Sequence, residues 1–288
     1  MSKFFEAITN GAGDLNGVGL PFAVRSFQLP AASIGLLEPG SAEPRESCTA
    51  LAPITYRTVS IRVPRNAPLL PFDGLDSSAA ESYRIIRSKL VQHAARPRVI
   101  CISSASAGDG KTVNALNLAS SFALKKDTTA ILVDVDMRRS QLAQLLNVPA
   151  GPGLAEVLSE QCAPQEAIVR VQELPNLFFL PAGRCRRNPA ELLDSSSWRS
   201  LIDFLCKQFH FVVLDSPPVG IVADYDLIHS ASDGVVLIAR PGHSNRKLIQ
   251  KGIEQAPKEK FLGVVLNCAE DWFLWRSNDR YYSYEHHD

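Results

Sequence analysis

The stretch Ala-Ser-Ala-Gly-Asp-Gly-Lys-Thr, residues 105–112, decides the fold of this 288-residue chain. It lies between an apolar run at 98–103, typical of a buried strand, and a run at 112–124 whose apolar residues recur with helical spacing. The pattern G-x-x-x-x-G-K-[ST] holds at its last three residues, although Ala105 replaces the first glycine. Small residues in this setting let backbone N–H groups turn inward, and the helix N-terminus adds partial positive charge. The sequence therefore predicts a phosphate-binding loop at a strand–helix junction.

Two side chains of this loop carry the expected chemistry. Lys111 should reach the β- and γ-phosphates of a nucleotide, and the hydroxyl of Thr112 should ligate Mg²⁺. The alternative interpretation is a glycine-rich turn between strand and helix that binds no ligand. The nucleotide-binding residues predicted within the loop are Ser106, Ala107, Gly108, Asp109, Gly110, Lys111 and Thr112.

Composition limits the class of protein. The chain is 45% hydrophobic and 21% charged, which fits a soluble globular protein with one large domain and extensions. Acidic and basic residues balance at 30 each, so we expect no nucleic-acid partner. The 6 cysteines include no C-x-x-C pair, which fits free thiols in a reducing compartment and gives no zinc signature. No run approaches the ~18–20 apolar residues that span a bilayer, and the N-terminus lacks the layout of a signal peptide, so we expect a cytoplasmic protein.

Three regions differ in composition. Residues 1–75 are rich in Gly, Pro, Ala and Ser, and we expect an N-terminal extension or linker there. Within it, the β-branched segment 54–63 is either an edge strand or an extended linker, and the sequence does not choose between them. Residues 76–275 form the predicted P-loop domain, and residues 276–288 form a tail that contains tyrosines.

From Ser78 onward, helical and strand patterns alternate. Short apolar runs such as 131–133 and 234–238 predict strands that are buried on both faces. Such strands separated by helices predict an α/β fold of the P-loop NTPase type, with a mostly parallel sheet covered by helices on both faces. Its ligand should lie at the carboxyl ends of the strands. Helices are expected at 78–94, 110–125, 139–146, 189–194, 195–208, 223–230 and 244–255, and strands at 98–103, 129–134, 177–180, 211–215, 233–239 and 261–267.

Acidic residues stand at the ends of two predicted buried strands. Asp134 and Asp136 lie in the run Ile-Leu-Val-Asp-Val-Asp-Met-Arg-Arg, and Asp215 ends the run Phe-Val-Val-Leu-Asp. Mg²⁺ prefers few carboxylates together with waters and phosphate oxygens, and one or two of these acids near Thr112 fit that preference. A carboxylate there can also accept the proton of an attacking hydroxyl. Taken singly, each Asp could instead be a helix N-cap.

Together these motifs resemble those of a known family. The phosphate loop, Val-Asp-x-Asp-x-Arg-Arg and Leu-Asp-Ser-Pro-Pro are similar to the Walker A, A′ and B motifs of bacterial tyrosine kinases (BY-kinases) of the capsular and exopolysaccharide biosynthesis type, within the MinD/ParA-like P-loop ATPases. The matching segments are 105–112, 131–139 and 212–218. The resemblance implies a protein-tyrosine autokinase that uses ATP and Mg²⁺ and regulates the polymerisation and export of a polysaccharide.

The resemblance also implies roles for the central residues. The expected catalytic residues are Lys111, Asp134 and Asp136, and either acid could orient the incoming tyrosine hydroxyl. Mg²⁺ would be held through Thr112, Asp136 and Asp215. These assignments place all of the chemistry at the phosphate loop and two strand ends.

Three further matches lie outside these motifs. Asn267 ends a strand and resembles an adenine-reading residue, since its amide can both donate and accept. The pattern E-x-x-R-x-x-R places Glu81, Arg84 and Arg87 along one side of a helix, where they resemble the family's ring-assembly motif. The alternative interpretation of these charges is a solvated helix face. The alternative interpretation of the C-terminal tyrosines is an unstructured aromatic tail. The expected phospho-acceptors are Tyr281, Tyr282 and Tyr284.

Partners follow from the same resemblance. We expect a ring-shaped homo-oligomer, a membrane adaptor of the polysaccharide co-polymerase type and a protein tyrosine phosphatase. Because the chain contains no membrane-spanning run, it resembles the split form of the family, in which the adaptor brings the kinase to the inner face of the cell membrane. The alternative is a MinD/ParA-like switch ATPase or a ring scaffold that transfers no phosphate to tyrosine. MinD/ParA proteins carry a signature lysine where this chain has Ser106.

Overall fold

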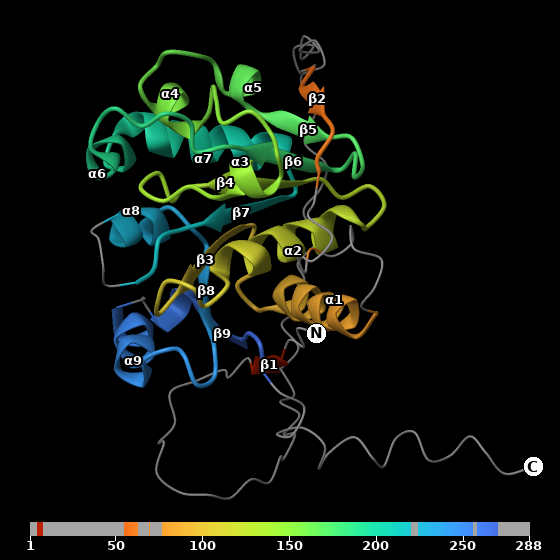
Figure 1. Cartoon of the computed structure of the whole chain (residues 1–288), viewed down its shortest axis with the longest axis vertical. Helices are drawn as coiled ribbons and strands as arrows, with labels where there is room; N and C mark the ends of the chain where they lie inside the picture. Colours follow the sequence, from red (N-terminus) through yellow and green to blue (C-terminus); the bar gives the residue numbers. More distant parts are fainter. Residues whose placement is uncertain are drawn as a thin grey trace, which may run out of the picture. The chain divides into compact units, whose positions relative to one another are not determined.

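The computed structural model describes residues 5–7, 55–62, 69, 77–219, 224–255 and 258–269 (Figure 1). Most of the predicted extension 1–75 and all of the predicted tail 276–288 lie outside these ranges. The three motifs of the predicted site lie within them.

The described strands form a nine-stranded sheet with the order β1-β9-β8-β3-β7-β4-β6-β5-β2. Six neighbouring pairs are parallel, whereas β1–β9 and β5–β6 are antiparallel. The central strands are buried along their length, which explains their almost continuous apolar sequences. The strands are β1 (Phe5–Ala7), β2 (Arg57–Val59), β3 (Val99–Ser104), β4 (Ala130–Asp134), β5 (Val169–Val171), β6 (Leu177–Leu180), β7 (Phe211–Asp215), β8 (Gly234–Ala239) and β9 (Phe261–Leu266).

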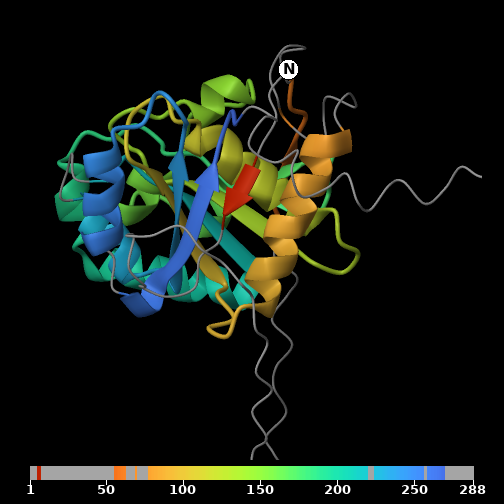
Figure 2. The same cartoon turned by 90° about the horizontal axis from the view of Figure 1, so that it is seen from below.

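Helices cover both faces of this sheet, because successive side chains of a strand point to opposite faces. In β3, Ile100 and Ile102 belong to the apolar core that contains α1 and α2, whereas Val99 and Cys101 belong to the core that contains α7 and α8. Figure 2 shows α1 and α9 on opposite sides of the sheet. The helices are α1 (Ser77–Gln92), α2 (Lys111–Ala123), α3 (Leu142–Leu145), α4 (Leu154–Leu158), α5 (Pro164–Ala167), α6 (Pro189–Leu193), α7 (Ser196–Gln208), α8 (Asp224–Ser230), α9 (Arg246–Gln255) and the 3₁₀ turn Lys258–Lys260.

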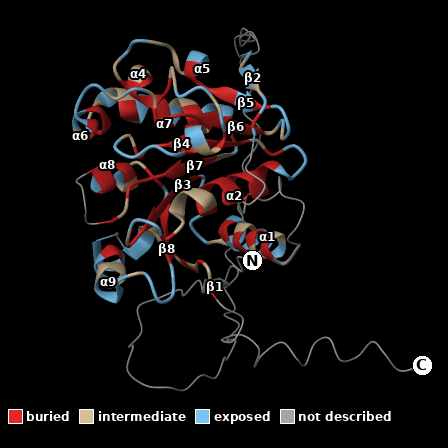
Figure 3. Cartoon of the chain, viewed as in Figure 1, coloured by how far each residue is buried: buried red, intermediate tan, exposed pale blue. Residues whose placement is uncertain are grey.

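The predicted fold class is confirmed: the sheet is mostly parallel and helices cover both of its faces. The central strands are buried, and the outward sides of α1 and α9 are exposed (Figure 3). The edge-strand alternative for 54–63 is also confirmed, since β2 pairs with β5 at the end of the sheet.

Some elements differ from the sequence-based expectation. The helix expected at 139–146 shortens to α3, because the backbone N–H of Arg139 donates to the carbonyl of Asp136 and closes a turn after β4. The short elements α4, α5, β1 and β5 were not predicted. Each has five residues or fewer, too few to display a hydrophobic period.

We expect Phe122 to be a main stabilising contact between α2 and the sheet. Its ring stacks on Phe211 with centroids 4.0 Å apart, and the residue is 1% exposed. Phe122→Ala should lower the free energy of unfolding by about 3–5 kcal/mol in denaturant titrations, because it leaves a cavity. Leu124→Ala is the matched control: Leu124 is 52% exposed, so its loss should stay within about 0.5 kcal/mol. Equal losses in the two variants would contradict this packing.

Candidate active site

The phosphate loop has a backbone that depends on glycine at two positions. Gly108 and Gly110 have φ values of 87° and 92°, in the left-handed region that other residues rarely adopt. A Cβ on Gly110 would also clash with Nδ2 of Asn267 and would displace this amide. Because α2 begins at the next residue, Lys111, the positive end of its dipole lies at the loop.

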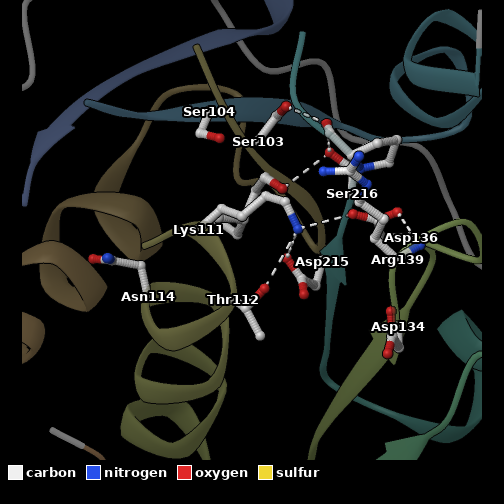
Figure 4. Close-up of polar contacts among 12 residues, drawn as sticks. Ser103, Ser104, Lys111, Thr112, Asn114, Asp134, Asp136, Arg139, Asp215 and Ser216 are labelled. Carbon is white, nitrogen blue, oxygen red and sulfur yellow. Dashed lines mark hydrogen bonds and ion pairs between the residues drawn. The ribbon is translucent and has the colours of Figure 1, made fainter. Parts of the chain in front are cut away.

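Lys111 lies among acids that come from different motifs (Figure 4). Its Nζ is 3.1 Å from Oδ2 of Asp136 and 3.5 Å from Oδ1 of Asp215. The same Nζ donates to Oγ1 of Thr112 at 3.4 Å. Residues predicted separately from the Walker A, A′ and B motifs are therefore brought to one point.

Sheet pairing explains why the two strand ends meet. In the parallel ladder of β4 and β7, Asp134 is opposite Asp215. One further bond, from the N–H of Val135 to the carbonyl of Asp215 at 2.9 Å, continues the pairing past β4. Asp136 is the next residue after Val135, and its Oδ1 accepts a hydrogen bond from the backbone N–H of Arg139 at 3.1 Å. The parallel sheet thus determines which acids share the site, and the turn after β4 orients Asp136.

The balance of charge sets the protonation of this cluster. Burial alone would lower the pKa of Lys111, but Asp215 and Asp136 outweigh that effect and raise it. Burial raises the pKa of Asp215, although Lys111 and a hydrogen bond with Thr112 oppose the rise. The buried ammonium therefore stays charged and partly neutralises the acids around it.

Asp134 has the more strongly shifted carboxyl. Burial and the nearby charge of Asp215 raise its pKa to about 7, while a hydrogen bond from Ser140 and the charge of Lys111 oppose the rise. Ser140 Oγ donates to Oδ2 of Asp134 at 2.7 Å. Within the described part of the chain, the buried Oδ1 of Asp134 has no hydrogen-bond partner. A carboxyl with this pKa can exchange a proton near neutral pH, as a general base must.

Hydrogen bonds hold the loop and the turn, and they involve three residues that the sequence analysis did not single out, Arg138, Asp224 and Ser244. The buried Asp109 accepts from the N–H of Ser106 at 2.7 Å and from Ser244 Oγ at 2.6 Å. Arg138 donates to both carboxylate oxygens of the buried Asp224, at 2.7 and 3.0 Å. No local motif reveals these pairs, because their members are 86 and 135 residues apart along the chain.

The predicted adenine reader has a contact with the loop itself. Nδ2 of Asn267 donates to the backbone carbonyl of Asp109 at 2.7 Å. Its buried Oδ1 has no hydrogen-bond partner within the described residues. The donor of this amide is therefore used internally, and its acceptor is left for another group. Adenine recognition by Asn267 stays a prediction.

The charges predicted for assembly do not all point outward. Glu81 and Arg84 are exposed and form a pair with each other, with 2.7 Å between Oε2 and Nη1. Arg87 instead donates to the carbonyl of Ser121 on α2. Arg87 thus has a role in packing α1 on α2, and its role in assembly stays a prediction. The predicted acceptors Tyr281, Tyr282 and Tyr284 lie outside the described residues.

The donors at the site fit Mg²⁺ held jointly with a nucleotide. Within the described ranges, no group of three or more His, Cys, Asp or Glu could hold a metal ion by itself. Asp136, Asp215 and the hydroxyl of Thr112 nevertheless lie around Lys111 at the phosphate loop. A small set of oxygen donors of this kind is what Mg²⁺ uses when phosphates and waters supply its other ligands.

Comparison with known proteins agrees with this geometry. A family model described as an AAA domain matches residues 97–255, which is more than half of the chain. The fold and the phosphate loop define a P-loop ATPase domain. None of the helices in the described part of the chain combines the length and the apolar character needed to cross a membrane.

Curated relatives and solved structures narrow this class. The chain is 32% identical to the tyrosine-protein kinase CpsD of Streptococcus pneumoniae serotype 4, over 66% of this chain and 84% of that protein. It is 31% identical to the tyrosine-protein kinase YwqD of Bacillus subtilis, over 65% and 80% of the two chains. The crystal structure of the chimerical protein CapA2B2 superposes with a TM-score of 0.65 at 29% identity, over 73% of this chain and 92% of that one. The chain belongs to the bacterial tyrosine kinases, and it is a protein-tyrosine kinase.

The raised pKa of Asp134 predicts a pH-dependent cost in protein without nucleotide or metal. Between the ordinary pKa of 3.8 and about 7, the folded state holds a proton that the unfolded state has lost. Wild-type stability should therefore fall relative to Asp134→Asn as pH rises from 4 to 7, and the difference should level off above pH 7. The total should be on the order of 4 kcal/mol.

Denaturant titrations at several pH values measure this difference. Asp203→Asn is the control, because it makes the same change at an exposed acid of α7, outside the site. A constant difference between wild type and Asp134→Asn from pH 4 to 8 would contradict the assignment.

Proposed function

We propose that this kinase transfers phosphate from ATP to tyrosines of its own C-terminal tail and so regulates the polymerisation and export of an exopolysaccharide. The observation that carries the proposal is the position of Lys111 beside Asp136, Asp215 and Thr112 at a phosphate loop. In this proposal, residues 76–275 form the kinase domain, residues 276–288 the acceptor tail and residues 1–75 an extension.

ATP would bind through the phosphate loop. Lys111 would contact the β- and γ-phosphates, and backbone N–H groups of the loop would bind the phosphate oxygens. Mg²⁺ would be held by Thr112, Asp136 and Asp215 and would neutralise part of the phosphate charge. The open Oδ1 of Asn267 would accept from the adenine amino group. The loop residues proposed for this binding are Ser106, Ala107, Gly108, Asp109, Gly110, Lys111 and Thr112.

A carboxylate would then receive the proton of the attacking tyrosine. Asp134 has the pKa suited to this role, about 7, and lies opposite Asp215 at the strand end. Asp136 lies nearer to Lys111, with 3.1 Å between Oδ2 and Nζ, and is the other candidate. Most of the rate enhancement in such a site comes from positioning and from charge stabilisation, to which Lys111 contributes.

Assembly would supply the acceptor. The exposed pair Glu81 and Arg84 on α1, together with Arg87, would contact a neighbouring subunit in a ring, and a tail from one subunit would enter the site of another. Each phosphate adds roughly −1.5 to −2 charges, which would favour release of the tail from an acid-rich site. An adaptor of the polysaccharide co-polymerase type would bring the kinase to the inner face of the cell membrane, and a protein tyrosine phosphatase would reverse the modification.

Lys111→Met tests the nucleotide site. The variant should weaken Mg-ATP binding by at least about tenfold, because a charge-assisted contact contributes roughly 1.5–3 kcal/mol. Titration calorimetry measures the affinity, and circular dichroism checks that the fold is intact. Lys125→Met removes an exposed lysine near the C-terminal end of α2 and should leave affinity unchanged. Wild-type affinity and phosphate transfer in Lys111→Met would reject the assignment.

A triple Tyr→Phe variant tests the tail. Changing Tyr281, Tyr282 and Tyr284 together keeps the aromatic rings and removes the nucleophiles, so the protein should bind ATP normally and lose most autophosphorylation. Mass spectrometry after incubation with Mg-ATP locates the phosphate, and Tyr56→Phe is the control. Phosphate found chiefly on Tyr56 or Tyr83 would overturn the tail assignment. No phosphotyrosine in wild type, even with an adaptor, would favour a switch ATPase or a ring scaffold.

A further inference from the structure

A buried tyrosine on α1 is connected to the backbone of the phosphate loop. Tyr83 is 2% exposed, and its hydroxyl donates to Oδ1 of Asn114 on α2 at 2.9 Å. It also makes a hydrogen bond with Asn117, one turn further along α2. Burial raises the pKa of Tyr83 above its ordinary value, so the hydroxyl keeps its proton and stays a donor.

Asn114 links Tyr83 to the phosphate loop. Its Nδ2 donates to the carbonyl of Gly110 at 2.9 Å, and its backbone N–H donates to the same oxygen at 3.0 Å. The side-chain bond therefore adds to the ordinary helical bond and fixes the carbonyl from a second direction. Since the amide of Asn114 is held through Oδ1 by Tyr83, the orientation of Nδ2 depends on the tyrosine hydroxyl.

A second amide holds the preceding carbonyl. Nδ2 of Asn267, at the end of β9, donates to the carbonyl of Asp109 at 2.7 Å. In a trans peptide the C=O of one residue and the N–H of the next point in opposite directions. Holding the carbonyls of Asp109 and Gly110 therefore also sets the directions of the N–H groups of Gly110 and Lys111. Such N–H groups are the ones through which a loop of this kind binds phosphate.

We propose that Tyr83 is a positioning residue for the phosphate loop and acts on it through Asn114. The inference rests on the proposed nucleotide site. Tyr83 need not touch the nucleotide, because its hydroxyl orients the amide that holds the carbonyl of Gly110. The Glu81–Arg84 pair is exposed on a different side of α1 from Tyr83. A subunit that binds there would therefore contact the same helix that orients the loop.

The test measures the binding of ADP to the full chain, because ADP engages the loop without phosphate transfer. Tyr83→Phe removes a single hydroxyl and should weaken ADP binding roughly fivefold, the contribution of about one neutral hydrogen bond. Asn114→Ala should weaken it at least as much. In the double variant the affinity should match that of Asn114→Ala alone, since the tyrosine acts only through the asparagine.

Tyr225→Phe is the matched control. Tyr225 is also fully buried, but its hydroxyl has no hydrogen-bond partner within the described residues, so ADP affinity should not change. A purely structural tyrosine would lower the melting temperature without changing ADP affinity measured well below it. That result for Tyr83→Phe would overturn the proposal. It would also be overturned if the losses of ADP affinity caused by Tyr83→Phe and Asn114→Ala multiply in the double variant.

Amide hydrogen exchange gives a second measurement that does not need the Asn114 variant to fold. With ADP at saturation, the amides of Gly110 and Lys111 should exchange faster in Tyr83→Phe than in wild type. Unchanged protection of these amides would overturn the proposal. Because neither measurement involves tyrosine phosphorylation, they separate this inference from the proposal for the tail.

Discussion

The active site depends on Lys111, because its positive charge neutralises acids that the fold brings together. Parallel strands end at one edge, so Asp134 and Asp215 are brought opposite each other, and Asp136 follows within one turn. Buried like charges repel strongly unless a cation or a proton compensates. Lys111 compensates Asp136 and Asp215, with Nζ–Oδ distances of 3.1 and 3.5 Å, whereas Asp134 takes a proton near pH 7. The same arrangement supplies a cation for phosphate and an acceptor for a proton.

This cluster works only if the phosphate loop keeps one conformation. The loop uses two glycines with positive φ, and a loop of this kind is easily displaced unless its backbone groups are bonded. Its carbonyls are held from outside by Asn114 and Asn267, and Asp109 ties it to Ser244. The loop is therefore shaped by α1, α2, β9 and the segment before α9, and not by its own sequence alone.

The sequence predicted much of this arrangement because the relevant signals are local. Buried parallel strands are continuous apolar runs, and the Gly-Lys-Thr of residues 110–112 marks the start of α2, so the fold class and the central residues could be inferred before any contact was known. Predictions failed where elements are short, as in β1 and α4. Spacing also does not show every contact of a side chain: a helical pattern predicts that Arg87 shares a face with Glu81 and Arg84, but it does not predict the hydrogen bond from Arg87 to the carbonyl of Ser121.

By itself the sequence determined the fold class, the phosphate loop and the identity of Lys111, Asp134, Asp136 and Asp215, because each belongs to a motif of neighbouring residues. Only the tertiary structure decided how these motifs meet, which acid keeps a proton, and how Tyr83 reaches the loop through Asn114. The physical reason is distance along the chain. Asp134 and Asp215 are 81 residues apart, and the Tyr83 hydroxyl and the Asn114 amide lie on different helices. Each pair meets only after the fold has brought its elements together, and no local pattern records that approach.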